Sequence, residues 1–312
     1  MGTYCFGIDV GGTTVKCGLF RTDGTLVEKW EIPTRKENNG DQILPDVAAA
    51  VNAKMEEKGI SKAEVEGVGI GVPGPVNSKG EVSRAVNLFW GYKNVVGEME
   101  ELTGLHAEAG NDANVAALGE AWKGAAAGSS DVIMVTLGTG VGGGIIINGK
   151  ILTGENGAGG EIGHMCVNLE ETDTCGCGGH GCLEQYASAT GISRLARKKM
   201  EHETRATILT KEDLSAKAVF DAVKEGDEVA IEVATEMGNY LGHAMADMAA
   251  VLDPAVFVIG GGVSKAGEVL LSFIEKSFME KAFFANKNVK FKLATLGNDA
   301  GICGAAKLVL ED

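Results

Sequence analysis

Short apolar runs, each closed by glycine or proline, recur along the chain and predict buried β-strands. The first two, at 4–10 and 14–20, lie on either side of a glycine turn, and a third at 26–32 would complete a meander. Further strands are predicted at 65–72, 131–138, 142–149, 255–261 and 289–295. Apolar residues at helical spacing predict helices at 41–58, 95–102, 114–124, 188–202, 215–225, 227–252, 264–281 and 299–310. This alternation is typical of an α/β protein.

One strand–glycine–strand pattern occurs twice. Residues 9–13 (DVGGT) join the first two predicted strands, and residues 137–144 (LGTGVGGG) join two strands in the middle of the chain. Each pattern opens an α/β segment, which suggests two related domains. Glycine hairpins are common in glycine-rich chains, so a chance similarity is the alternative.

The composition favours a cytoplasmic protein of two domains. A chain of 312 residues, 45% of them hydrophobic, can bury two cores of ordinary size. Its net charge of −15 argues against a nucleic-acid partner, because phosphate backbones require Lys and Arg. The first residues lack the features of a signal peptide, and no apolar run is long enough to span a bilayer. We therefore expect no membrane partner.

The first glycine turn has the chemistry of a phosphate loop. Gly11 and Gly12 leave backbone N–H groups open to an anion, and Thr13 adds a hydroxyl donor. Asp9 can hold a magnesium shell, and Lys16 can place a positive charge near a transferred phosphate. The pattern is neither a Walker loop nor a dinucleotide fingerprint, since no helix follows the glycines. A plain hairpin turn is the alternative.

Two further glycine segments are candidate nucleotide contacts. Gly138, Thr139 and Gly140 lie in the second strand–glycine–strand pattern and could face phosphates. The triplet Gly260-Gly261-Gly262 ends a predicted strand and opens a helix, where N–H groups favour an anion. Taken alone, the triplet is more typical of an ordinary α/β crossover turn.

Asn111-Asp112 lies between a short predicted strand and a helix. Asp112 is a candidate general base that would accept a hydroxyl proton during phosphoryl transfer. Asp112, Asn111 or Asn114 could instead cap the helix, and local sequence alone favours capping.

A loop rich in cysteine and glycine predicts a metal site. His164, Cys175, Cys177 and Cys182 form a Cys₃His set, which is common in closed structural zinc sites. His180 could replace His164, Cys166 could compete, and reduced thiols or a redox pair are the alternatives without metal. Glu161, His164 and Glu184 bracket the loop and could bind sugar hydroxyls, although surface charges are their simpler explanation.

Together these motifs resemble the ROK family (repressor, open reading frame, kinase) and, within it, the bacterial glucokinases. The resemblance extends over residues 4–310. It is carried by Asp9-x-Gly-Gly-Thr13-x-x-Lys16, Gly71-Val-Pro-Gly74, Asn111-Asp112, Glu161-x-Gly-His164 and Cys175-x-Cys-Gly-x-x-Gly-Cys182-x-Glu184. Gly110 stands where many members have a larger residue, and Cys166 is an extra thiol.

The resemblance implies an actin-like, ribonuclease-H-like fold of two α/β domains around a hinged central cleft. Residues 1–112 and 299–312 would form the smaller domain, and 113–298 the larger. It also implies an ATP-dependent hexose kinase that phosphorylates glucose at the 6-hydroxyl, with Mg²⁺, a structural Zn²⁺ and a homodimeric or homotetrameric assembly. N-acetylglucosamine, N-acetylmannosamine, fructose and allose are alternative substrates.

The same resemblance implies a role for each site residue. Asp112 would be the catalytic base. The sugar would be bound by Gly74, Asn87, Asn111, Glu161, His164 and Glu184. Asp9, Gly11, Gly12, Thr13 and Lys16, with Gly138, Thr139 and Gly140, would face the phosphates, and Gly260, Gly261 and Gly262 the adenosine. Zinc would be held by His164, Cys175, Cys177 and Cys182. A non-catalytic sugar-binding regulator is the rival, although the first strand starts at residue 4 and leaves no room for a DNA-binding domain before it.

Overall fold

The computed structural model describes residues 2–310 and divides into two compact units. Unit 1 contains the chain up to Ser130, the segment Gly144–Gly160 and the C-terminal segment from Thr295. Unit 2 contains Asp131–Gly143 and Glu161–Ala294. The predicted boundary at residue 112 lies inside unit 1, because the helix that begins there packs against the C-terminal helix of the same unit. As a division of function, the predicted boundaries remain a prediction, and so does the hinge.

Unit 1 is built on a five-stranded sheet in the order β3-β2-β1-β4-β7. Its strands are β1 (Tyr4–Val10), β2 (Thr14–Arg21), β3 (Leu26–Pro33), β4 (Val65–Val72) and β7 (Ala107–Asn111). The first three form the predicted antiparallel meander, whereas β1, β4 and β7 run parallel. A small ribbon of β5 (Glu81–Val82) and β6 (Lys93–Asn94) was not predicted from the sequence.

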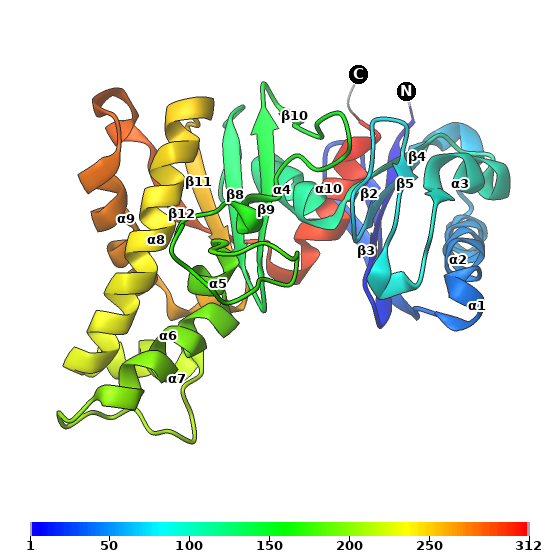
Figure 1. The fold of residues 1–312 in the computed structure, drawn as a ribbon. Helices are drawn as coiled ribbons and strands as arrows, with labels where there is room; N and C mark the ends of the chain where they lie inside the picture. Colours follow the sequence, from blue (N-terminus) through cyan, green and yellow to red (C-terminus); the bar gives the residue numbers. More distant parts are fainter. Residues whose placement is uncertain (1, 311–312) are drawn as a thin grey trace. The chain divides into compact units, whose positions relative to one another are not determined.

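Helices cover both faces of this sheet (Figure 1). Phe6 and Ile8 of β1 join the core with α2 (Ile43–Lys58) and α3 (Val95–Thr103). On the opposite face, α10 (Ala300–Leu308) packs against the strands and against α4 (Asp112–Lys123). A side chain at Gly69 would meet the Ala305 carbonyl oxygen at 1.7 Å. Glycine is therefore needed for α10 to approach the sheet this closely.

A second sheet, most of which belongs to unit 2, repeats this strand order around β8 (Val132–Leu137). The second sheet has the order β10-β9-β8-β11-β12, with β9 (Val141–Ile147), β10 (Lys150–Ile151), β11 (Val256–Gly260) and β12 (Lys290–Leu293). As in the first sheet, the opening strand is central, and two parallel strands follow on one side of it. The boundary between the units falls within β9. The shared topology supports the two related domains predicted from the glycine repeat.

The helices of unit 2 are mostly those predicted, with short interruptions. They are α5 (Glu184–Ala187), α6 (Ala189–His202), α7 (Ala216–Lys224), α8 (Glu228–Leu252) and α9 (Glu268–Lys281). Figure 1 shows α8 and α9 side by side next to β11 and β12. The helix predicted from residue 264 instead begins as a 3₁₀ turn at Gly262–Ala266 and restarts after Gly267, which has a φ of 81°. None of the helices within residues 2–310 is long and apolar enough to cross a membrane.

Candidate active site and metal centre

Three candidate residues of unit 1 lie at the edge of its sheet that is formed by the carboxyl ends of the parallel strands. In the parallel register Asp9 pairs with Gly71, and Val72 pairs with Asn111. The carboxyl ends of β1, β4 and β7 therefore lie together, and this is where α/β sheets usually bind ligands. Asp9, the turn after β4 that contains Gly74, and Asn111 all lie at this edge.

The first glycine turn is held by several contacts. The Gly11 amide donates to the Thr14 carbonyl at 3.0 Å, and the Thr34 hydroxyl donates to the Gly11 carbonyl at 2.7 Å. Asp9 and Lys16 face each other across the β1–β2 pair, with 3.7 Å between Lys16 Nζ and Asp9 Oδ2. Burial raises the pKa of the Asp9 carboxyl, while Lys16 opposes that rise. The turn thus presents backbone N–H groups beside a partly buried ion pair.

The structure distinguishes the three possible helix caps at the start of α4, Asn111, Asp112 and Asn114. Asn111 is the cap, because its Oδ1 accepts from the amides of Ala113 at 3.0 Å and Asn114 at 3.2 Å. Its Nδ2 donates to the Gly74 carbonyl at 3.1 Å, which ties the cap to the turn after β4. Asp112 is the first residue of the helix and accepts from the Ala113 amide at 2.8 Å. Helix capping therefore explains the presence of Asn111 at this position, but it does not explain Asp112.

The second glycine turn, in unit 2, is bonded to the start of α6. The Gly138 amide donates to the Gly140 carbonyl at 3.0 Å, and the Ala189 amide donates to the Gly138 carbonyl at 2.8 Å. The Thr190 hydroxyl donates to the Thr139 carbonyl at 2.6 Å. A Cβ on Gly140 would lie 2.6 Å from Glu184 Oε2. The turn and the predicted sugar ligand Glu184 are therefore direct neighbours.

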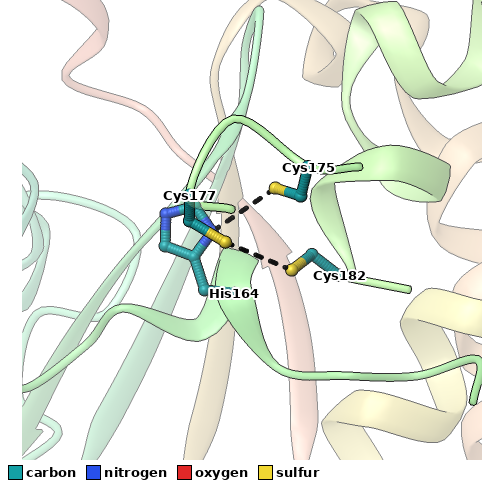
Figure 2. A group of neighbouring side chains, drawn as sticks. All are labelled: His164, Cys175, Cys177 and Cys182. Carbon is teal, nitrogen blue, oxygen red and sulfur yellow. Dashed lines mark hydrogen bonds between the residues drawn. The ribbon is translucent and has the colours of Figure 1, made fainter. Parts of the chain in front are cut away.

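The predicted metal ligands come together in unit 2. The ligand atoms of His164, Cys175, Cys177 and Cys182 all lie within 4.8 Å of one another. Figure 2 shows the four side chains pointing toward one centre. His180 and Cys166 are not part of this group. The motif Glu161-x-Gly-His164 is folded against β9, because a side chain at Gly163 would meet the Val141 carbonyl oxygen at 2.1 Å.

The donor set fits a tetrahedral zinc ion. Sulfur atoms on one tetrahedral Zn²⁺ stand about 3.8 Å apart when each Zn–S bond is about 2.3 Å. The Cys177 and Cys182 sulfurs are 3.6 Å apart, and His164 Nδ1 is 3.9 Å from the Cys175 sulfur. Glu184 Oε1 accepts from the Cys175 thiol at 3.1 Å. The metal group and the second glycine turn thus contact the same carboxylate.

A cavity of about 340 Å³ lies in unit 2 beside the third glycine segment. Gly262 and Val263 line one side, and Ser215 and Phe220 line another. Its volume is within the range of small-molecule sites, which is about 300–1,000 Å³. Of the predicted triplet, Gly262 is the residue at the cavity wall. The α7 residues that line this cavity belong to no sequence motif and were not predicted as site residues.

Comparison with known proteins identifies the family. The model of the ROK family matches residues 5–312. The chain belongs to the ROK family. It is 44% identical to a glucokinase of Halalkalibacterium halodurans, over 98% of this chain and 94% of that one. It is 31% identical to an N-acetylgalactosamine kinase of a Shewanella species, over 97% and 96% of the two chains.

A solved structure extends the comparison to the fold. The ROK family glucokinase from Streptomyces griseus, in complex with glucose and AMPPNP, aligns with a TM-score of 0.74 and 35% identity, over 98% of each chain. The fold class implied by the sequence resemblance, an actin-like α/β fold, is confirmed for this ROK family member.

A network around Arg194 in this ROK protein was missed by sequence reasoning. Arg194 contacts the carboxylates of Glu171 and Asp173, and the Tyr186 hydroxyl donates to Glu171 at 2.6 Å. Gln185 adds a bond to the Asp173 carbonyl at 2.9 Å. The metal loop is therefore attached to α6 at a second point, away from the metal. These residues lie within 171–194 but form no recognisable motif.

Proposed function

We propose that the protein is a glucokinase, which transfers the γ-phosphate of ATP to the 6-hydroxyl of glucose. The observation that carries the proposal is the edge of the first sheet, where an Asp–Lys pair, a glycine turn and Asn111-Asp112 are brought together. The glycine turn and Lys16 suit phosphate, Asp9 suits magnesium, and Asp112 suits a reacting hydroxyl. Glucokinases among the relatives, matched over nearly their full length, support the same reaction and substrate.

In unit 1, Asp112 would accept the proton of the 6-hydroxyl as it attacks phosphorus. Asn111 caps α4 and bonds the Gly74 carbonyl, so it fixes the backbone from which Asp112 projects. Gly74 and Asn87 would contact the sugar. Preorganised groups of this kind contribute mainly by holding the reacting hydroxyl in line with the phosphate.

In unit 2, Glu161, His164 and Glu184 would bind the other hydroxyls of the sugar. His164 turns Nδ1 toward the Cys175 sulfur. If Nδ1 ligates the metal, Nε2 remains available to the sugar. The second oxygen of Glu184 lies near Gly140, so this carboxylate would align the sugar with the phosphate-facing turn.

The nucleotide would be held by all three glycine segments. The two turns, Gly11 to Thr13 and Gly138 to Gly140, would face the phosphates. The amides of Gly12, Thr13, Thr139 and Gly140 would donate to phosphate oxygens, and Lys16 would add positive charge. Asp9 would hold magnesium through water. The cavity beside Gly262 suits the adenine ring, because most of its wall is apolar. Gly260 and Gly261 would shape the approach to it.

We propose that the Cys₃His group holds a structural zinc ion. Four protein ligands close a tetrahedral site and leave no position for a substrate, so the ion would supply organisation rather than chemistry. It would fix the loop that carries His164 and precedes Glu184. The cytoplasm, where ATP is available, is the compartment that we propose. A homodimer or homotetramer remains an expectation.

A hexose panel with a coupled assay for ADP release tests the function. We expect ATP-dependent turnover with glucose, and a kcat/KM for glucose above those for N-acetylglucosamine, N-acetylmannosamine, N-acetylgalactosamine, fructose and allose. Preference for an N-acetylhexosamine would retain the kinase and replace the substrate. Sugar binding without ADP release from any hexose would favour the non-catalytic regulator.

A further inference from the structure

The loop between the two strands of the small ribbon in unit 1 is unusually well anchored. Ala85 and Trp90 bond each other through both backbone amides at 3.1 Å. Leu88 and Trp90 are buried, and the Trp90 indole N–H donates to the Gly40 carbonyl at 3.1 Å. The tip that these anchors hold is therefore rigid, although it is exposed.

Large apolar side chains point outward from this rigid tip. Val86 is 65% exposed and Phe89 is 61% exposed, and Asn87 between them is also exposed. Phe89 has a φ of 59° and a ψ of 19°, which is the left-handed region. For a residue with a bulky side chain this conformation is strained, and such strain often occurs at functional sites. Neither burial nor backbone preference explains a phenylalanine at this position.

The tip lies at the same sheet edge as the phosphate turn. The Asn87 carbonyl oxygen is 3.9 Å from the Cβ position of Gly12, and the Arg84 carbonyl oxygen is 2.6 Å from that of Gly74. Gly74 in turn accepts the bond from Asn111. The loop therefore connects the predicted sugar contacts with the first glycine turn, entirely within unit 1.

A lysine holds the Phe89 ring from the side of that turn. Lys36 Nζ lies 5.7 Å from the ring centroid, within the range of a cation–π contact. Lys36 follows Thr34 by two residues, and Thr34 bonds both the Gly11 carbonyl and the Thr13 carbonyl. Lys36 thus links the Phe89 ring to the segment that is bonded to the phosphate turn.

We propose that Phe89 is a substrate-positioning residue whose ring packs against the apolar C–H face of the bound hexose. This inference rests on the proposed function. A pyranose ring exposes C–H groups on its faces, and aromatic side chains commonly line ligand sites in which a few polar groups set the orientation. Asn87 would supply a polar contact and Phe89 the apolar one, both from the same rigid tip.

Substitutions at Phe89 separate the ring from the strained backbone. Phe89→Ala removes the ring and keeps the left-handed strain, whereas Phe89→Gly removes both. We expect both variants to raise the glucose KM about tenfold, which corresponds to about 1.4 kcal/mol. The ATP KM and kcat should change less than about twofold, because the lost contact exists before and during the reaction. Phe89→Tyr should retain the wild-type KM.

The melting temperature provides a second readout. The Gly variant should melt roughly 2–4 °C above the Ala variant, because glycine adopts positive φ without strain. A ring with a purely structural role would leave glucose affinity unchanged. Phe284→Ala is the control, since Phe284 is 75% exposed in unit 2 and has no assigned role.

Calorimetric titration of glucose without nucleotide tests the role of the Phe89 ring independently of the kinase assignment. If the wild type binds glucose but releases no ADP, the kinase assignment fails, and the affinities of the Phe89 variants still decide the role of the ring. Glucose Kd and KM values within twofold of wild type in both Phe89→Ala and Phe89→Gly would overturn the inference. A wild type that binds no hexose would overturn both.

Discussion

The two glycine turns occupy equivalent places in sheets of the same topology, yet they differ in charge and support. The first turn lies between Asp9 and Lys16, which pair across β1 and β2. The second turn, Gly138–Thr139–Gly140, has no charged residue and is bonded to α6 through Ala189 and Thr190. Both turns therefore present backbone donors, but only the first turn is flanked in sequence by charged residues, Asp9 and Lys16.

The support of neighbouring groups differs in the same way. In unit 1, the site residues project from strands and helix starts that pack on apolar cores. In unit 2, His164 lies in a loop that also carries the three cysteines of the proposed metal site, and Glu184 directly follows this loop. Arg194 of α6 binds the loop through Glu171. Site geometry in unit 1 should therefore tolerate loss of a polar contact, whereas in unit 2 it should depend on such contacts.

The largest effect is expected at Asp112. Asp112→Asn keeps the size of the side chain and cannot accept a proton, so kcat should fall at least ~10²-fold. Glucose affinity measured by calorimetry should be largely retained. A variant with normal turnover and a lower melting temperature would show that Asp112 has only a helix-terminal role.

Asp9→Asn should separate function from stability at the charged turn. Loss of a charged contact to the magnesium shell should reduce kcat roughly 10- to 100-fold, with little change in glucose affinity measured without nucleotide. Burial raises the pKa of Asp9 in the folded state, so the folded protein holds this proton more tightly, and ionisation at neutral pH opposes folding. The neutral amide should therefore maintain or raise Tm. A large loss of glucose affinity with normal turnover would contradict the assignment of Asp9 to the magnesium shell.

Local signals allowed much of the fold to be predicted and also mark where prediction failed. The strands around both glycine turns follow from apolar runs and turn residues, and they lie close to the predicted ranges. The helix predicted at 188–202 is α6, which begins after Ser188 because the Ser188 side chain accepts from the Gly191 amide. The short helix α5 that precedes it was not predicted. The sequence predicts that a serine can cap α6, but it does not predict that the start of the helix is buried.

The grouping of candidate side chains was predictable where one short motif holds all of them, whereas their roles remain predictions. Asp9, Lys16 and the four metal ligands lie within short segments, so spacing was informative. Glu120 shows the opposite case, because this buried carboxylate accepts from the amides of Ala125, Thr295 and Leu296. Contacts across so many residues depend on the tertiary fold, and no local pattern predicts them.

Loss of a proposed zinc ligand tests whether the site residues of unit 2 depend on their loop. Cys175→Ser should lower bound zinc below one per chain, lower Tm and raise the glucose KM roughly tenfold, because the ion would no longer organise the loop that carries His164 and precedes Glu184. Cys166→Ser is the matched control and should retain the metal. Zinc loss with unchanged glucose kinetics would show that the loop is held well enough by the Arg194 network alone.

A smaller effect is expected when a methyl group is added to the second turn. The Cβ of Gly140→Ala would lie 2.6 Å from Glu184 Oε2, so the carboxylate must move. We expect the glucose Kd to rise a few-fold, about 1 kcal/mol or less. Gly176→Ala in the metal loop meets nothing within 4 Å and should leave the Kd unchanged. Equal affinities in both variants would mean that Glu184 does not contact the sugar.

The smallest effect, a change in pH dependence, isolates the ion pair of the first turn. Lys16 lowers the pKa of Asp9 against the larger effect of burial, so Lys16→Met should raise that pKa further. Asp9 must be ionised to act on magnesium, and activity is lost as the pH falls through its pKa. The acidic limb of the normalised kcat profile should therefore move to higher pH. Lys29→Met, which breaks a pair with Asp299, removes the same charge from the neighbouring strand and should leave the limb in place. If both variants shift the limb equally, the cause is net charge rather than the Asp9–Lys16 contact, and the two turns differ less than their sequences suggest.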